Sequence, residues 1–462
     1  MRRSNKHEMR KVAMSPLSGG INLAVPPEQI GENEMQECQN MWYERDTQRL
    51  VGRGGLKLVS SFDNPIKSLC YDLESNTSFV FLYDRNTYNV VLSDVETQRR
   101  NIGKVTGEGR AKACRFGEDI FIVSGDVLQY YGFKQGSVLQ TVNNAPKADL
   151  IFYRFGRLAV IKVGNSSRVT FSSTGDAKSD VAWTENSADQ SYSQWIDVGD
   201  KDSSYIMDAV PLATDIMFFK SSGKVYQLAG DAEPASWRVY NPVTGSDLTN
   251  AFRAGSCATN VGGEVVFLSL NGLKALSTTQ DYGNISPSTL GAKFNKLLTR
   301  RQYEPEIYNM RRHQTLMIRS TLDKTTWVAY NYALNAATVL KFAVPVEAIL
   351  ETKDDVYVAS GNNLYLWTDE AATDDGEPID YIVKPRDILG SDELLVKAID
   401  TKFSSDHAGK ATVSIGDRLH VGMPTNSRRK VRCNHSTDCI SLTVQSNSKF
   451  ELDHIMLDVV DL

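Results

Sequence analysis

The chain is poor in features that identify several classes of protein. Its 462 residues contain only six dispersed cysteines, which argues against a disulfide framework and predicts reduced thiols. The formal net charge of −5 excludes a uniformly basic nucleic-acid coat, although it permits a local basic face. The 32 glycines and 14 prolines follow no period, which excludes a collagen-like chain. The 41% hydrophobic content is instead typical of a globular protein with a sizeable core.

Long hydrophobic runs are also missing. The longest apolar runs, such as 215–219 and 265–268, fall far short of the roughly 20 residues that a membrane-spanning helix needs. The basic first residues are not followed by an apolar stretch, so we expect no secretory signal. We therefore expect a protein that is made in a cytoplasm and has no membrane segment.

Motifs that carry catalysis are absent as well. The chain has no G-x-S-x-G nucleophile elbow, no phosphate-binding loop, no H-E-x-x-H and no dinucleotide fingerprint. A carboxylate pair of the glycosidase type stays open, because among 56 acidic residues some pair will be close in space. No pair stands out, so we expect no enzyme, no catalytic residues and no cofactor.

Two groups of residues have the composition of metal sites but not the spacing. Cys433, His435 and Cys439 could supply three zinc ligands, yet they lack a fourth ligand and a recognised spacing. A loop between strands with incidental thiols is the favoured interpretation. The acidic residues Asp197, Asp200 and Asp202 lack the remainder of a calcium loop, which favours a solvated turn. We expect no metal site.

The dominant pattern is a short alternating strand, a turn rich in Gly, Asn or Ser, and a second short strand. Seven such hairpins recur at intervals of roughly 40–60 residues, the spacing of propeller blades. This favours an all-β fold, a β-propeller of six or seven blades, over a β-sandwich array that does not close into a ring. The hairpins lie at 79–95, 118–130, 155–172, 214–228, 263–273, 315–332 and 355–367.

Three local patterns stand apart. A helix is predicted over 290–298, because polar capping residues precede apolar residues at helical spacing. A second, weaker helix candidate covers 27–39. Residues 321–327 resemble the Asp-box hairpin of sialidase-type propellers but lack its turn glycine. We interpret them as an ordinary hairpin, with Trp327, Tyr330 and Tyr332 as blade packing.

The composition and strand pattern of the sequence change after Trp367. An acidic, turn-rich stretch at 369–377 indicates a boundary, and new alternating runs follow it, including 394–403 and 450–460. They suffice for a small C-terminal β-sandwich of about 80 residues. The predicted organisation is an N-terminal arm with a leading segment (1–60), a β-propeller (61–368) and a C-terminal β-sandwich (369–462).

Two basic clusters are the candidate interface or DNA-facing residues. Either cluster could contact phosphate or an acidic partner. The competing interpretation is a flexible N-terminal tail and a solvated hairpin tip. The clusters consist of Arg2, Arg3, Lys6, Arg10 and Lys11 near the N-terminus, and Arg428, Arg429, Lys430 and Arg432 near the C-terminus.

A series of short segments follows a recognisable order along most of the chain. The segments are PLSGGINL (16–23), QNM (39–41), RGGLKLV (53–59), VYQLAG (225–230), GSCA (255–258), GEVVFLS (263–269), NGL (271–273), ISP (285–287), KAI (397–399) and the final run 450–460. Each segment alone has low specificity, but their order resembles one family, the packaged-DNA stabilisation or tail accessory (nozzle) proteins of short-tailed bacteriophages.

The resemblance implies a structural virion protein of the tail that assembles as a ring, a hexamer, below the portal and adaptor rings. Such a ring extends the DNA channel, helps to retain the packaged double-stranded DNA without sequence specificity, and carries needle, spike or fibre proteins. A mildly acidic subunit is compatible with a DNA channel, because such a channel should not bind the DNA phosphates tightly. The family offers no catalytic motif to transfer.

Two alternatives remain. One is a propeller-based host-recognition, hub or baseplate protein of another tail type, for which exposed aromatic residues and saccharide binding are expected. The other is a propeller enzyme that acts on host polysaccharide.

Overall fold

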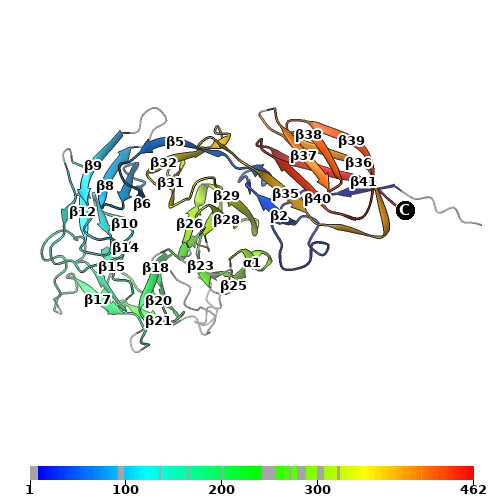
Figure 1. The fold of residues 1–462 in the computed structure, drawn as a ribbon. Helices are drawn as coiled ribbons and strands as arrows, with labels where there is room; N and C mark the ends of the chain where they lie inside the picture. Colours follow the sequence, from blue (N-terminus) through cyan, green and yellow to red (C-terminus); the bar gives the residue numbers. More distant parts are fainter. Residues whose placement is uncertain are drawn as a thin grey trace, which may run out of the picture.

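Seven antiparallel blades of four strands each form most of the chain in the computed structural model (Figure 1). Five blades are separate four-stranded sheets, and two are parts of larger sheets. The structure describes residues 9–91, 98–134, 137–164, 167–186, 188–199, 202–241, 256–269, 272–277, 288–298, 306–319, 323–406 and 408–462. The first four sheets, or blades, are β6 (Ile66–Asp72), β7 (Thr77–Leu82), β8 (Asn86–Val91), β9 (Gln98–Lys104); β10 (Lys112–Phe116), β11 (Asp119–Val123), β12 (Gln129–Gly132), β13 (Gln140–Thr141); β14 (Leu150–Arg154), β15 (Arg157–Ile161), β16 (Arg168–Phe171), β17 (Gln194–Asp197); and β18 (Ile206–Leu212), β19 (Asp215–Lys220), β20 (Val225–Ala229), β21 (Arg238–Tyr240).

The remaining three blades complete a ring. Each first strand contacts the first strand of the next blade, in the order β6, β10, β14, β18, β22, β26, β30, and β30 contacts β6 again. The fold is therefore a closed propeller, and among the described residues we count seven blades. Blades five to seven are β22 (Ala258–Val261), β23 (Glu264–Ser269), β24 (Gly272–Ser277), β25 (Ser288–Leu290); β26 (Glu306–Met310), β27 (Thr315–Arg319), β28 (Thr326–Asn331), β29 (Ala336–Lys341); and β30 (Ala348–Glu351), β31 (Val356–Ser360), β32 (Asn363–Thr368), β5 (Gly55–Ser61).

The seven predicted hairpins correspond to the second and third strands of the seven blades. The second strands are almost wholly buried, because the neighbouring blades cover both faces of the sheet. This explains the short apolar runs at 215–219 and 265–268, which lie in β19 and β23. Trp327 and Tyr330 are buried between blades, as predicted, and Tyr332 packs against the same core at partial exposure.

The last blade is closed by a strand from the N-terminal part of the chain. Strand β5 pairs antiparallel with β32, with Leu56 opposite Trp367. Pairing of distant segments in one blade fastens the ring, since the first and last blades cannot separate without breaking this ladder.

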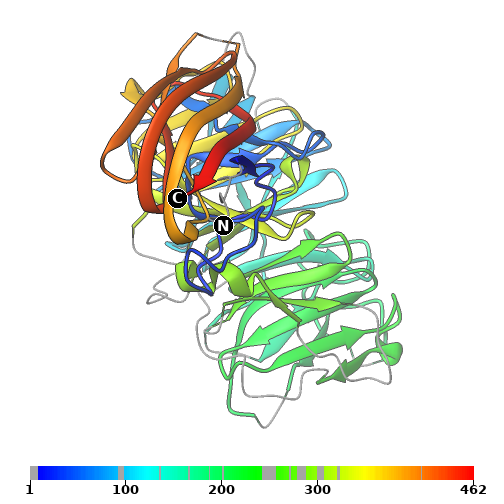
Figure 2. The same cartoon turned by 90° about the vertical axis from the view of Figure 1, so that its right-hand side faces the viewer.

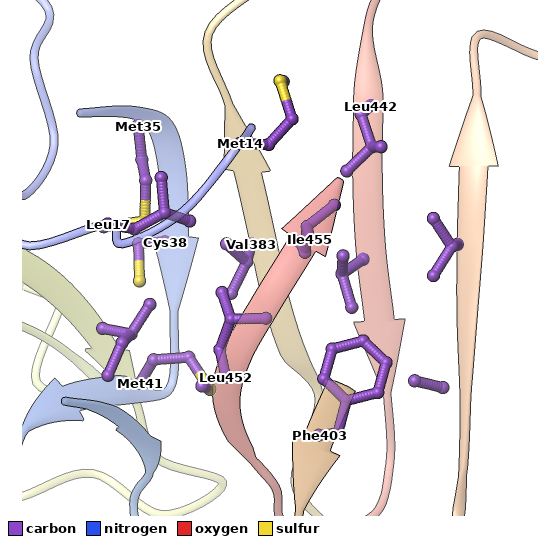
Figure 3. Close-up of a cluster of buried hydrophobic side chains, with 14 of the residues drawn as sticks. Met14, Leu17, Met35, Cys38, Met41, Val383, Phe403, Leu442, Leu452 and Ile455 are labelled. Atoms are coloured by element: carbon purple, nitrogen blue, oxygen red, sulfur yellow. The ribbon is translucent and has the colours of Figure 1, made fainter. Parts of the chain in front are cut away.

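A β-sandwich follows the propeller in sequence, as predicted. Its two sheets enclose the largest apolar cluster of the protein, in which Phe403, Leu442, Val383 and Ile455 meet (Figure 3). One sheet contains β3 (Met41–Tyr43), β4 (Leu50–Gly52), β41 (Glu451–Asp461), β36 (Ile388–Ser404), β39 (Arg428–Ile440) and β1 (Met9–Ala13), and the other contains β2 (Met35–Gln39), β35 (Tyr381–Pro385), β40 (Leu442–Ser446), β37 (Lys410–Ile415) and β38 (Leu419–Pro424).

The N-terminal segment, predicted as a separate arm at 1–60, is distributed over both units. Strands β1, β3 and β4 belong to the sandwich and β5 to the propeller. Strand β2 lies between β29 and β35, so that one nine-stranded sheet runs from blade six into the sandwich (Figure 1). These pairings join residues that are 300 or more positions apart, so no local sequence pattern could predict them. Figure 2 shows the sandwich at one side of the propeller, where the first described strand, β1, pairs with the last strand, β41.

The helix predictions need correction. Within 290–298, Leu290 ends β25 because it pairs with Leu273, and Gly291 turns the chain with φ +61°. Only a 3-10 turn, η2 (Ala292–Phe294), and a single α-turn, α1 (Asn295–Leu298), follow, while 286–287 and 299–301 lie outside the described residues. The candidate over 27–39 is wrong, because Met35 and Cys38 of β2 face the sandwich core. The other short elements are η1 (Pro234–Ser236), η3 (Arg311–His313), β33 (Thr373–Asp374) and β34 (Glu377–Pro378).

Across the described part of the chain, no helix has the length and apolar character to cross a membrane.

Candidate functional site

The structure brings described members of both basic clusters into one sheet. Strand β1, which carries Lys11, pairs with β41; β41 pairs with β36; and β36 pairs with β39, which carries the C-terminal cluster. The alternation of side chains along each strand places Lys11, Lys430 and Arg432 on the outer face, away from the core. The sequence alone gave no sign that the clusters would be neighbours. We call this outer surface of β1, β41, β36 and β39 the basic face.

Two carboxylates hold cations of the basic face in place. Arg428 forms a two-pronged ion pair with Asp400, Nε to Oδ1 at 3.0 Å and Nη2 to Oδ2 at 2.6 Å. The hydrogen bond from Arg428 lowers the pKa of Asp400, and the same bond raises the pKa of Arg428. Lys430 Nζ lies 2.6 Å from an oxygen of Asp458. Since both acids are nearly buried beneath the cations, the charges that reach solvent are mainly positive.

Positive charge is in excess on the basic face. The cations Lys11, Lys402, Arg428, Lys430 and Arg432 outnumber by two the carboxylates that pair with them, Asp400, Asp453 and Asp458. Of these, Lys11 and Arg432 are exposed and have no ion-pair partner in the described part of the chain.

The other predicted basic residues take different positions. Arg429 is exposed at the start of β39, but the alternation of the strand turns it away from the basic face. Arg10 pairs with Asp461 across β1 and β41, Nη2 to Oδ1 at 3.1 Å. The remaining candidates, Arg2, Arg3 and Lys6, lie outside the described residues.

A cavity of about 440 Å³ opens beside the basic face and adds residues that the sequence analysis missed. Arg49, Lys402, Arg428 and His454 line it together with Asp453. Arg49 and Lys402 share the carboxylate of Asp453, at 3.2 Å each. The alternation of 394–403 could have revealed Lys402 as a polar-face residue, whereas Arg49 reaches the site through the pairing of β4 with β41.

His454, a residue of the cavity wall, has a buried ring nitrogen. Nε2 of His454 is inaccessible to solvent and has no hydrogen-bond partner among the residues that the structure describes. With three cations in the same wall, the site could accept an anionic oxygen of a phosphate or carboxylate. Its chemistry is recognition of charge, since the basic residues are already held by acids and offer donors rather than a nucleophile.

The metal candidates do not form sites. In the described ranges no three His, Cys, Asp or Glu side chains lie close enough to hold an ion. The cysteines are free thiols, and Cys433 Sγ donates instead to the carbonyl of Val396 at 3.4 Å. Cys433 and Cys439 lie within strand β39 rather than in the predicted loop, because the ladder with β36 extends past both.

The solvated turn predicted for Asp197 to Asp202 is wrong at its last residue. Asp202 is buried against Lys220, Oδ1 to Nζ at 2.9 Å, and accepts a hydrogen bond from Tyr226 at 3.0 Å. Asp197 pairs with Arg168, and Asp200 lies outside the described residues. The cation that neutralises Asp202 is therefore Lys220, at the end of β19. This lysine lies 18 residues away in sequence, outside any local calcium-loop pattern.

Comparisons with known proteins return propellers. No family model matches the sequence, and no curated protein matches it. Among solved structures, the Cps50 (Swd1) β-propeller domain of Myceliophteria thermophila is 8% identical, with a TM-score of 0.47, over 68% of this chain and 99% of that one. Virginiamycin B lyase from Staphylococcus aureus is 7% identical, with a TM-score of 0.46, over 67% and 97%. The WD40 propeller domain of Doa1 is 10% identical, with a TM-score of 0.43, over 68% and 97%.

Proposed function

We propose that the protein is a structural subunit of a short-tailed phage tail, which assembles into a ring below the portal and adaptor and lines or borders the DNA channel. The role needs no catalytic residue or cofactor. Its partners are further copies of the chain, with a hexamer as the expected ring, the adaptor ring, the distal tail proteins and packaged DNA.

The basic face carries this proposal. Members of both clusters, Lys11 from one and Lys430 and Arg432 from the other, lie on one sheet surface of an otherwise acidic protein, and the cations there exceed the carboxylates that pair with them by two. A local cationic surface of this kind attracts phosphates without reading bases, since the face is a sheet surface and offers no helix or ribbon to enter a groove. DNA retained in a channel requires weak, sequence-independent contacts of this sort.

The continuous sheet that joins propeller and sandwich also supports the proposal, because it makes the subunit mechanically rigid. Because β2 continues the sheet of blade six into the sandwich, propeller and sandwich share one hydrogen-bonded framework. A ring around a pressurised genome needs subunits that keep their shape under load. The order of sequence motifs that resembles the nozzle family adds to this support.

The test of assembly is negative-stain imaging and mass determination of the protein mixed with the portal–adaptor complex of its own phage. A ring of subunits that forms on this complex is the expected result. A protein that stays monomeric and unattached would overturn the proposal.

The test of DNA contact is the salt dependence of binding to a short DNA duplex. The slope of log K against log salt is negative, and each neutralised phosphate adds about 0.9 to its magnitude. Replacement of Arg432 and Lys11 by Glu should therefore reduce the magnitude of the slope by about 1.8. The control replaces Lys57 and Lys104, exposed cations of the propeller, by Glu and should leave the slope unchanged. Equal effects of the two pairs, or a preference for one duplex sequence, would contradict a role for the basic face.

A further inference from the structure

A second surface, far from the basic face in sequence, has a different character. The turns between the first and second strands of blades one, two and three lie on the same face of the propeller, and two adjoining hollows open there. Their volumes are about 600 Å³ and 490 Å³. Arg115, near the end of β10, lines both hollows and so belongs to the wall that they share. We call the two hollows together the blade groove.

Aromatic rings form the floor and sides of the blade groove. Phe133 and Tyr153 are 36% and 52% exposed, unusually high values for side chains of their size. Tyr153 packs on Phe116 with ring centroids 5.7 Å apart, and Phe133 packs on Tyr131 at 5.4 Å. These contacts fix the rings from behind, so the groove offers aromatic surface that needs little ordering when a ligand binds.

The charged groups of the groove are held and balanced. Nη1 of Arg115 lies 2.6 Å from Asp72, and its Nε lies 2.7 Å from Glu74. Lys178 pairs with Asp119, and its Nζ lies 4.9 Å from the centre of the Tyr130 ring. Since acids and bases are present in nearly equal number, the groove has little net attraction for a polyanion such as DNA.

Part of the rim lacks side chains. Gly117, Gly156 and Gly175 line the second hollow, each with a positive φ. A Cβ added at Gly117 or Gly175 would meet nothing within 4 Å, so the open space beside the backbone is available to a ligand. The backbone can therefore approach a bulky, rigid ligand closely.

We propose that the blade groove binds a neutral saccharide chain. The C–H face of a pyranose ring is apolar and packs on an exposed aromatic ring, while its hydroxyl groups need donors and acceptors at fixed positions. Phe133 and Tyr153 supply the rings, and the paired Arg115 and the exposed carboxylate of Glu118 supply polar partners. A ligand that is polar but uncharged fits this balance of charge better than an acidic polymer or an apolar peptide does.

This inference stands apart from the proposed ring, because it uses another surface and other residues. Its success would leave the ring untouched, and failure of the ring to form would not affect it. It assigns to the propeller the capacity for host-surface attachment.

The experiment is affinity electrophoresis of the full-length protein in gels that contain dextran, galactomannan or glucomannan, with polygalacturonate and heparin as acidic probes. We expect retardation by at least one neutral polymer, and a reduction of the apparent affinity by tenfold or more in Tyr153→Ala and in Glu118→Gln. The matched control is Tyr240→Ala, because Tyr240 is also 52% exposed but lies on β21 outside the groove.

Both groove variants change exposed side chains, and thermal melting followed by circular dichroism should give the wild-type midpoint. No retardation in any neutral gel, retardation in acidic gels alone, or equal losses in the groove and control variants would each overturn the proposal. Capture of a phage protein by the groove, with no effect of saccharide, would do the same and would identify a docking surface.

Discussion

The buried side chain of Arg53 forms hydrogen bonds to several distant segments of the chain. Its guanidinium is fully buried and donates to both oxygens of Asp374, at 2.8 Å and 2.5 Å. It also donates to Asn40 Oδ1 at 3.1 Å and to the carbonyl of Lys341 at 2.8 Å. These partners come from the sandwich strands, blade six and the acidic stretch 369–377. A single cation therefore ties together the segments that meet where propeller and sandwich join.

Removal of one charge from this pair should destabilise the protein strongly. Asp374→Asn leaves the guanidinium of Arg53 buried without a counter-charge, for which we expect a loss of roughly 3–5 kcal/mol in the free energy of unfolding. Urea unfolding measures it. The control is Asp369→Asn, because Asp369 is 70% exposed and its pair with Lys449 is a surface pair. A loss in Asp374→Asn no larger than in the control would mean that water reaches the pair.

Gly54 acts through lack of a side chain rather than through its dihedral angles. A Cβ at this position would lie 2.2 Å from the carbonyl oxygen of Thr368, which is backbone and cannot step aside. The glycine therefore allows β5 to begin its ladder with β32.

Gly54→Ala should separate these segments and loosen the closure of the ring. We expect a loss of about 1–3 kcal/mol, the usual cost of overpacking, measured by thermal or urea unfolding. Gly422→Ala serves for comparison, since a Cβ there meets nothing within 4 Å and the change should be nearly neutral. Equal stability of the two variants would contradict the closure role.

At the scale of elements, β36 and β39 form the long antiparallel strand pair on which the basic face is built. Strand β39 is an edge strand, with β36 as its partner in the sheet. Charged side chains on an exposed edge discourage pairing with other chains. The cations of 428–432 thus have a protective role in the free subunit as well as the proposed contact with DNA.

The ion pair of Arg428 with Asp400 across these two strands should make stability depend on pH. The folded-state pKa of Asp400 is lowered, chiefly by Arg428, so its contribution is present above the unfolded pKa of about 3.9 and is lost as pH falls through the folded value. The unfolding midpoint of Arg428→Gln should therefore lie below that of wild type at pH 6, and the gap should shrink below about pH 4. Arg432→Gln should show no such convergence, because Arg432 has no ion pair among the described residues. A gap in Arg428→Gln that does not narrow at all as the pH falls from 6 to below 3 would refute the assignment.

At the scale of the molecule, the propeller and the sandwich are joined in more than one way. Trp42, on β3 of the sandwich, stacks on Trp367 of blade seven with centroids 5.0 Å apart. The nine-stranded sheet crosses the same junction. The two units therefore share core, charge pair and backbone hydrogen bonds.

This predicts a single unfolding transition. Cys38 in the sandwich core and Cys257 between propeller blades are both fully buried, and burial raises the pKa of each thiol. Pulse alkylation over a urea gradient, read by mass spectrometry, should give one midpoint for both cysteines. Two separate midpoints would show that the units unfold independently.

The sequence by itself determined the strand content and the repeat. An alternating run followed by a turn residue is a local signal, and it located the central hairpin of all seven blades and the β-sandwich beyond Trp367. It also found the basic residues 428–432, because clustered charge is visible without a structure. The local pattern over 290–298 failed where Leu290 pairs with Leu273, since a ladder to another strand outweighs weak helix propensity.

Only the tertiary structure decided what depends on distant contacts. The number of blades follows from the closure of the ring, and the blade groove follows from three turns that are brought side by side. The basic face exists because β1 and β39 join one sheet from opposite ends of the chain. Arg53 becomes a central cation only when Asp374 lies beside it, 321 residues away. The hydrogen bonds and contacts between two paired strands are the same whether the strands are near or far apart in sequence. Local sequence patterns therefore cannot show which distant strands or charged residues will pair.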